Sequence, residues 1–163
     1  MLISKRPATE ADHEFARGVH HRAYRDVIER QYGAWDDAAQ DQLFDDVWVA
    51  ANHEIILCDK IRCGYCGVEN RPRDILLREL VIDPVYQGRG IGTHVLHETL
   101  RIARTRDVPV RLRTQLLNSA AVLYRRLGFR ETGRTERHIL MEWRAGEEKE
   151  TNAAGRGTGT VQS

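Results

Sequence analysis

The sequence predicts a mixed α/β fold of the α+β type, in which a mostly antiparallel sheet carries helices on both faces. Strand-like segments rich in Val, Ile and Leu alternate with segments whose apolar residues recur at helical spacing. Residues 74–116 follow the pattern strand, helix, strand, and such a unit makes its two strands parallel. The remaining strands follow one another closely along the chain, which favours antiparallel pairing.

Length and composition predict one folded domain, over residues 1–145 of the 163-residue chain. Residues 146–163 are rich in Glu, Gly, Thr, Ala and Asn, which predicts a disordered C-terminal tail. The net charge is +1 and basic residues are interspersed with acidic ones, so we expect no nucleic-acid face. No apolar run has the length of a signal peptide or a membrane span, so we expect a cytoplasmic protein with no membrane partner.

In the N-terminal half, turn residues and helical spacing set the element boundaries. Pro7 ends the first strand, and Thr9 is a favourable N-cap for the long helix that follows. Asp36 or Asp37 caps the second helix, and a tight turn follows residue 58. The expected elements are a strand at 2–6, helices at 10–28 and 36–44, an ambiguous segment at 47–51, and hairpin strands at 53–58 and 61–69.

In the C-terminal half, Pro84 ends a strand, and a helix follows whose buried stripe closes with Ile102 or Ala103. Asn118 or Ser119 caps a short helix, for which Gly128 is a good C-terminal stop. The expected elements are a strand at 74–82, a helix at 90–106, a strand at 110–116, a helix at 118–127, and strands at 129–132 and 138–143.

A glycine-rich turn between the strand at 74–82 and the next helix predicts an anion-binding site. Gly88, Gly90 and Gly92 alternate where the helix begins, and the first N–H groups of a helix lack intrahelical partners. A dinucleotide site needs Gly-x-Gly-x-x-Gly and a P-loop needs Gly-Lys-Ser/Thr, and neither pattern is present. A purely structural turn does not account for three alternating glycines beside Gln87 and Arg89.

Gln87, Gly90 and Gly92 satisfy the pattern Gln-x-x-Gly-x-Gly, which resembles the acyl-CoA pyrophosphate loop of the GNAT superfamily of N-acetyltransferases. The resemblance covers residues 80–92 and the motif at 118–129, and the closing run 128–143 is similar to small bacterial members of unassigned substrate. It implies the superfamily fold, with a central splayed pair of parallel strands. It also implies an acyltransferase that moves an acetyl group from acetyl-CoA to a primary amine by direct attack in a ternary complex.

The resemblance implies where acetyl-CoA binds. The pantetheine arm would pair with strand backbone like an added strand, and the pyrophosphate would meet the N–H groups that open the helix. Arg89 would add a charge-assisted hydrogen bond. An asparagine at the position of Asn118 contacts the cofactor in the superfamily, a role compatible with capping the helix. The implied cofactor-binding residues are Leu80, Val81, Ile82, Gln87, Gly88, Arg89, Gly90, Ile91, Gly92, Thr93 and Asn118.

Three catalytic roles follow from the resemblance and the chemistry of thioester aminolysis. Tyr124 matches the tyrosine that gives the leaving thiolate its proton, and the N–H of Val81 would stabilise the oxyanion. Glu79 shares a strand face with Val81 and is the candidate general base. The alternative for Glu79 is a structural ion pair, for instance with Arg111 or Arg113, and His138 is the other candidate base.

The acceptor is expected to be the amine of a small molecule. A protein or peptide amine, a longer acyl donor and a non-catalytic acyl-CoA-binding regulatory module remain alternatives. Tyr32, Trp35 and Trp48 lie around the loop that walls the acceptor site in the superfamily; core packing is their other interpretation. With Asp36 and Asp37 near, they would select a cationic amine. A homodimer is compatible with the resemblance, since dimers are common among similar proteins.

The cysteines predict no metal site. Cys63 and Cys66 have Cys-x-x-Cys spacing, but on a strand residues three apart face opposite sides. A zinc site would also need a second ligand pair, which is not well placed in the sequence. With Cys58 the number of cysteines is odd, which favours reduced thiols.

Overall fold

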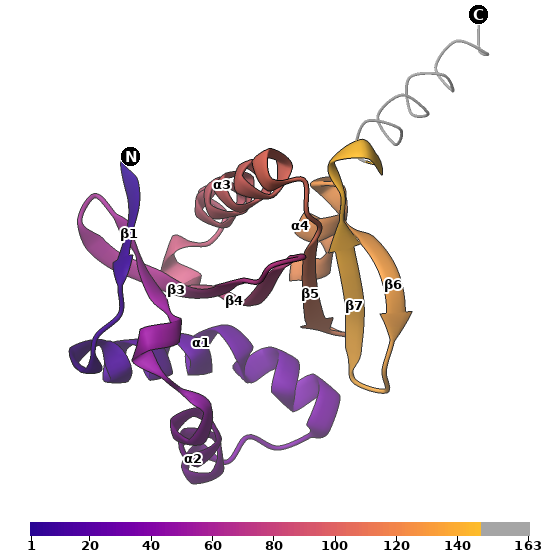
Figure 1. Cartoon of the computed structure of the whole chain (residues 1–163). Coiled ribbons are helices and arrows are strands. Elements are labelled where there is room, and N and C mark those ends of the chain that lie inside the picture. The colour runs from indigo at the N-terminus through magenta and orange to yellow at the C-terminus, as the bar shows by residue number, and fades with distance from the viewer. Residues whose placement is uncertain (148–163) are drawn as a thin grey trace, which may run out of the picture. The chain divides into compact units, whose positions relative to one another are not determined.

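A computed structural model describes residues 1–147, and the expected tail lies outside the described residues from residue 148 onward. The seven strands belong to one mixed sheet in the order β1-β2-β3-β4-β5-β7-β6 (Figure 1). This confirms the predicted fold class. By its internal contacts the chain divides into two units. The first comprises Met1–Glu69 and Leu77–His97, and the second comprises Asn70–Leu76 and the chain from Glu98.

The first unit holds most of the N-terminal elements. Its strands are β1 (Ile3–Pro7), β2 (Glu54–Cys58), β3 (Ile61–Asn70) and most of β4 (Ile75–Ile82), and its helices are α1 (His13–Tyr32), α2 (Asp37–Val47) and the first part of α3 (Ile91–Arg106). α1 continues beyond the predicted end at residue 28 because its last turn is polar and therefore carries no apolar signal. It ends at Gly33, which has a φ of 99°. The ambiguous segment at 47–51 contains the end of α2 and the start of a 3₁₀ turn at Ala50–Asn52.

Two apolar clusters cover opposite faces of the strands in this unit. Ile55 packs with residues of α1 and α2 and with Val81, whereas the adjacent Ile56 packs with Ile91 and Val95 of α3. Neighbouring residues of a strand face opposite sides, so α1 and the start of α3 lie on opposite faces. The alternation along β4 follows from this. Val81 faces the α1 side, and Leu80 and Ile82 pack on the α3 side.

A β-bulge in β3 places Cys63 on a different side of the strand from the one that its spacing to Cys66 predicted. The pairing of β2 with β3 shifts between Ile56 and Leu57, which leaves Cys63 as an extra residue on β3. Cys63 and Cys66 therefore pack in the same α3-side cluster, not on opposite faces as their spacing predicted. These two cysteines and Cys58 are buried and form no disulfide among residues 1–147, and burial raises the pKa of Cys63 to about 11.

The second unit contains the other strands and the short helix. Its elements are β5 (Val110–Gln115), α4 (Ala120–Arg126), β6 (Arg130–Arg134) and β7 (His138–Trp143), and β7 pairs antiparallel with both β5 and β6. The first residue of β4, Ile75, donates its N–H to the carbonyl of Pro109, one residue before β5 (2.9 Å). Both strands run onward from this shared end, as in the predicted strand–helix–strand unit. Ala103, not Ile102, closes the buried stripe of α3.

A network of charged side chains joins the turn before β4 to β5 and β7 in the second unit. Asp74 accepts hydrogen bonds from Arg71 and Arg111 at 2.6 Å each, and Arg111 also donates to Glu142 at 2.9 Å. The hydrogen bond from Arg71, added to that from Arg111, lowers the pKa of Asp74 to about 2 despite its burial. Arg111 is thereby committed to Asp74 and Glu142.

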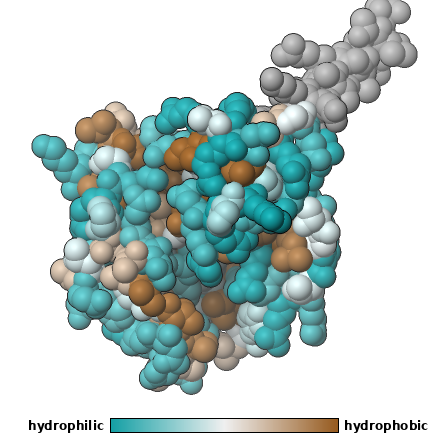
Figure 2. Space-filling model, viewed as in Figure 1, coloured by the Kyte–Doolittle hydropathy of each residue, from teal (hydrophilic) through white to brown (hydrophobic). Residues whose placement is uncertain are grey.

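The surface mixes polar and apolar side chains. Figure 2 shows hydrophilic residues over most of the visible face, with apolar residues distributed among them. No helix among residues 1–147 combines the length and the apolar character needed to span a membrane.

Candidate active site

The glycine turn follows β4 directly and is braced from α1. Asp83 accepts a hydrogen bond from Arg22 of α1 at 2.8 Å, and its other oxygen receives the N–H of Val85 at 3.4 Å. This fixes a 3₁₀ turn over Pro84–Tyr86 between the strand and the glycines. The backbone N–H of Asp83 also donates to the carbonyl of Cys63 on β3 at 2.8 Å. The chain therefore leaves β4 in a defined direction.

Two of the three glycines are required by backbone conformation. Gly88 and Gly90 have φ values of 76° and 80°, a region that residues with a Cβ rarely adopt. The N–H groups of residues 88–93 have no hydrogen-bond partner within residues 1–147. Three of them open α3, where the helix dipole adds partial positive charge. Six consecutive unpaired donors at a helix start form a site suited to a phosphate group.

The polar side chains of the turn occupy defined positions. Gln87 donates from its side-chain amide to the carbonyl of Ile82 at 3.0 Å, so it holds the end of β4. The guanidinium of Arg89 lies 5.2 Å from the centre of the Tyr86 ring. The Ile91 side chain is buried in the α3-side cluster, which leaves only its backbone to face a ligand.

Glu79, the candidate base, pairs with a histidine that the sequence did not suggest. Its Oε2 lies 2.7 Å from Nε2 of His53, while Nδ1 of His53 lies 2.8 Å from the carbonyl oxygen of Val49. The anticipated arginine partners are not involved, since Arg111 bonds Asp74 and Glu142. The neighbouring Arg78 bonds Glu69. His53 and Glu79 are 26 residues apart, and no spacing rule links a residue before one strand to a residue within another.

Aromatic rings surround this pair. Trp48 stacks on His53 with ring centres 4.1 Å apart, and Tyr65 meets both rings at steep angles. Burial by itself lowers the pKa of His53, but the hydrogen bonds to Glu79 and Val49 outweigh it and raise that pKa. Burial, with the nearby charge of Glu79, raises the pKa of Tyr65 well above its ordinary value. His20, on α1, has a pKa lowered to about 4 by burial and by His21.

The aromatic residues predicted around the acceptor loop separate in the structure. Trp48 joins the core next to His53. Trp35 lies against His21 and donates its indole N–H to Asp37 at 2.7 Å, and Asp36 caps α2. Tyr32 is exposed at the end of α1. The carboxylates of Asp36 and Asp37 are thus engaged locally, and only Trp48 lies beside the candidate base.

The second unit contains the remaining site candidates. Tyr124 on α4 is buried against Phe129, with no hydrogen bond to its hydroxyl among residues 1–147, and burial raises its pKa to about 12. Asn118 accepts the N–H of Ala120 through its side chain at 2.9 Å, and Ser119, the other predicted cap, occupies the N-cap position of α4. His138 begins β7, and its pKa is lowered by burial and by Arg113 and Arg137.

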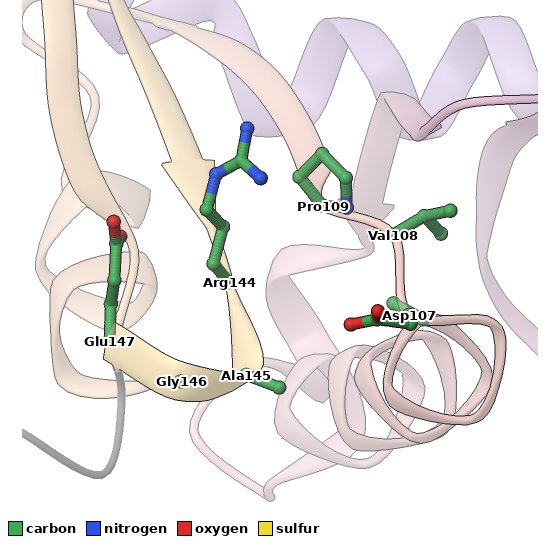
Figure 3. A pocket seen from close by; sticks show the side chains of 8 residues that line it. Asp107, Val108, Pro109, Arg144, Ala145, Gly146 and Glu147 are labelled. Carbon is green, nitrogen blue, oxygen red and sulfur yellow. The ribbon is translucent and has the colours of Figure 1, made fainter.

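A pocket of about 300 Å³ in the second unit contains none of these residues (Figure 3). It lies between the end of α3 and the chain that follows β7. Its lining residues are Ala103, Asp107, Val108, Pro109, Arg144, Ala145, Gly146 and Glu147. Within residues 1–147, no three His, Cys, Asp or Glu side chains are grouped to hold a metal ion.

The fold and the glycine turn together define an α/β protein with a run of unpaired N–H groups at the start of its crossover helix. Residues 44–131 match the model of the GNAT acetyltransferase domain, which is more than half of the chain. The chain belongs to the GNAT acetyltransferase family.

Individual relatives are similar over parts of the chain. Over 80 residues it is 39% identical to the N-alpha-acetyltransferase RimI of Mycobacterium tuberculosis, a match to 46% of this chain and 49% of that protein. It is 28% identical over 109 residues to an uncharacterized protein of Mycobacterium leprae, covering 58% of this chain and 30% of that protein. The matches thus span about half and under a third of these relatives' own lengths.

Solved structures share the fold. The PaiA N-acetyltransferase of Thermoplasma acidophilum, determined in complex with coenzyme A, superposes with a TM-score of 0.70 at 17% identity. The match covers 88% of this chain and 99% of the Thermoplasma chain. At this identity the similarity concerns the fold alone.

Proposed function

We propose that this protein transfers the acetyl group of acetyl-CoA to a primary amine, by direct attack in a ternary complex. The observation that carries the proposal is the run of six unpaired N–H groups at residues 88–93, in a chain of the GNAT acetyltransferase family. Coenzyme A has a pyrophosphate, which is the ligand that such a run of donors favours.

The donor would be held by the residues that the family resemblance indicates. The pyrophosphate would lie on the N–H groups of residues 88–93, with Arg89 moving from Tyr86 to add a charged hydrogen bond. The pantetheine amides would pair with the backbone of residues 80–82 as an added strand. Gln87 already occupies the carbonyl of Ile82, so its role is to fix the end of that strand. Asn118, whose side-chain oxygen accepts the N–H of Ala120, would also contact the donor.

In the proposed chemistry the acceptor nitrogen loses two protons and the sulfur gains one. Glu79 removes the first proton from the acceptor ammonium, and the free amine then forms a C–N bond as the C–S bond of the thioester breaks. Tyr124 gives its proton to the departing sulfur, the second nitrogen proton, released as the amide forms, restores the phenol, and the proton on Glu79 leaves to solvent. A phenol whose pKa is about 12 is protonated at neutral pH, as this role requires. The oxyanion would be stabilised by the N–H of Val81.

Two classes of acceptor compete. A small-molecule amine is the expectation from the sequence. The similarity to RimI of Mycobacterium tuberculosis, which is named an N-alpha-acetyltransferase, favours the α-amine of a protein as the second candidate. A panel that includes small amines and short peptides with free N-termini separates the two, because only one class should be turned over efficiently.

The experiment on Tyr124 tests the enzyme against a non-catalytic acyl-CoA-binding module. Acetyl-CoA affinity is measured by calorimetry, and turnover is followed on the amine panel. Tyr124→Phe should lower kcat by on the order of 10²-fold or more while the Kd for acetyl-CoA changes little. Failure of wild type to bind acetyl-CoA would refute the proposal, and binding without turnover on any amine would favour the regulatory module.

The experiment on Gly90 tests the anion site with a matched control. Gly90→Ala introduces a side chain at a φ of 80°, and Gly33→Ala does so at 99°; a Cβ has nothing within 4 Å at either position. Both variants should lose on the order of 1–3 kcal/mol of stability from backbone strain, since each places a Cβ at a positive φ. Only Gly90→Ala should weaken acetyl-CoA binding, because it alone disturbs the donors of residues 88–93. Equal affinities for the two variants would argue against the turn as the pyrophosphate site.

A further inference from the structure

We propose that His53 is a positioning residue for Glu79: as an imidazolium it holds one carboxylate oxygen and leaves the other free for the acceptor amine. The inference rests on the proposed function and deepens it, since it identifies the residue that orients the general base Glu79. His53 itself does not touch the acceptor. Its effect on catalysis passes through Glu79.

The hydrogen bonds define the protonation of His53. A carbonyl oxygen can only accept, so Nδ1, at 2.8 Å from the oxygen of Val49, carries a proton. An ionised carboxylate also only accepts, so Nε2, at 2.7 Å from Oε2 of Glu79, carries one too. A neutral ring would place two acceptors face to face at one of these contacts. The pair is therefore an imidazolium and a carboxylate, with both ring protons committed.

The packing around the ring prevents it from turning. Trp48 stacks on the ring with an interplanar angle of 23°, and Tyr65 meets it at 70° with centres 5.8 Å apart. Gly67 of β3 leaves the space that the ring needs, because a Cβ there would lie 3.3 Å from Cδ2 of His53 and 3.4 Å from Nε2. The His53 side chain is 9% exposed. Such a ring presents Nε2 in one direction only.

Glu79 remains open on its other side. Its side chain is 33% exposed, and among residues 1–147 its only hydrogen bond is the one to His53 through Oε2. The second oxygen, Oε1, is thus the atom available to an ammonium group. A carboxylate held at one oxygen is preorganised, and correct placement of a reacting group contributes strongly to rate.

The other charged and titratable groups near the pair do not replace His53. Arg78 is adjacent in β4 but bonds Glu69 of β3. On the α1 side, His20 has a lowered pKa and is neutral at pH 7, and Tyr24 is a phenol that adds to the raised pKa of Tyr65. Tyr65 of β3 is itself neutral at that pH. His53 is therefore the cation that faces Glu79.

A double-mutant cycle tests the positioning role. His53→Phe keeps a ring on Trp48 but removes both donors, and it should lower kcat by about tenfold or more, with the Kd for acetyl-CoA unchanged. In a Glu79→Gln background the same change should have little further effect. His53→Gln, which can still donate near the position of Nε2, should restore most of the lost kcat. An unchanged Kd also shows that each variant is folded.

The alternative outcomes are distinct. Equal losses from His53→Phe in both backgrounds, or no loss, would overturn the positioning role while leaving acetyl transfer intact. An inactive wild type would instead overturn the proposed function. In that case, nitrogen NMR of histidine-labelled protein can still test whether His53 is protonated on both ring nitrogens. Two protonated ring nitrogens are expected on His53 at pH 7 in wild type, and a lower His53 pKa in Glu79→Gln; a neutral ring in wild type would contradict the inference.

Discussion

Two histidines in one aromatic cluster show how single contacts set protonation. His20 lies against the rings of Tyr24 and Phe44, and His53 lies against those of Trp48 and Tyr65. The ring of His20 meets other rings and the imidazole of His21, so burial prevails and its pKa falls to about 4. His53 instead has two oxygen acceptors, and its pKa rises. The two rings therefore differ in their hydrogen-bond partners, which are an imidazole for His20 and two oxygens for His53.

The lowered pKa of His20 makes stability sensitive to acid. At pH values between about 4, the pKa of His20 in the folded protein, and about 6.5, its ordinary pKa, His20 is protonated in the unfolded chain and neutral in the folded one. Stability attributable to His20 is therefore complete above pH 6.5 and is lost as the pH falls toward 4, by up to about 3 kcal/mol. His20→Phe keeps ring packing but cannot titrate. Urea unfolding at pH 7, 5.5 and 4.5 should show a smaller acid loss for the variant, and identical pH dependence would contradict the assignment.

At the scale of elements, local sequence predicts what depends on local conformation. Gly88 and Gly90 could be recognised because their φ values demand glycine wherever the rest of the chain lies. The bulge at Cys63 could not, because it exists only through the pairing of β3 with β2. For the same reason the sequence does not predict the pair His53–Glu79, and it suggests arginine partners for Glu79 instead. Trp48, grouped with Tyr32 and Trp35 from sequence proximity, lies with His53 because tertiary packing decides its neighbours.

The approach of β3 to β4 beside the site depends on a glycine. A Cβ on Gly64 would lie 2.3 Å from the carbonyl oxygen of Val81, a backbone atom that cannot rotate away. Gly64→Ala should therefore destabilise the protein by about 1–3 kcal/mol, as overpacking does. Gly133→Ala is the control, since its Cβ would meet only the side chain of Leu140 at 3.5 Å. Denaturant unfolding compares the two; similar stabilities would mean that β3 can move away from β4 at low cost.

At the scale of the whole molecule, neither unit is a continuous segment. The chain passes between the units after Glu69, after Leu76 and after His97. These changes fall inside β3, β4 and α3 respectively, so each of these elements belongs to both units. A strand and a helix are hydrogen-bonded along their length, and unfolding one part of either element disturbs the other part. This continuity favours cooperative unfolding of residues 1–147.

Acetyl-CoA should stabilise this cooperative structure as one body. Its proposed phosphate site is at the start of α3 in the first unit, and α3 continues into the second. At 100 times its Kd, a ligand specific for the folded state adds about 2.7 kcal/mol. For a chain of this size that corresponds to an increase in Tm of roughly 5–10 °C. Calorimetry should show one transition that moves as a whole, with a smaller shift for Gly90→Ala at the same ligand concentration. Two transitions, of which acetyl-CoA moves only one, would mean that β4 and α3 do not couple the units.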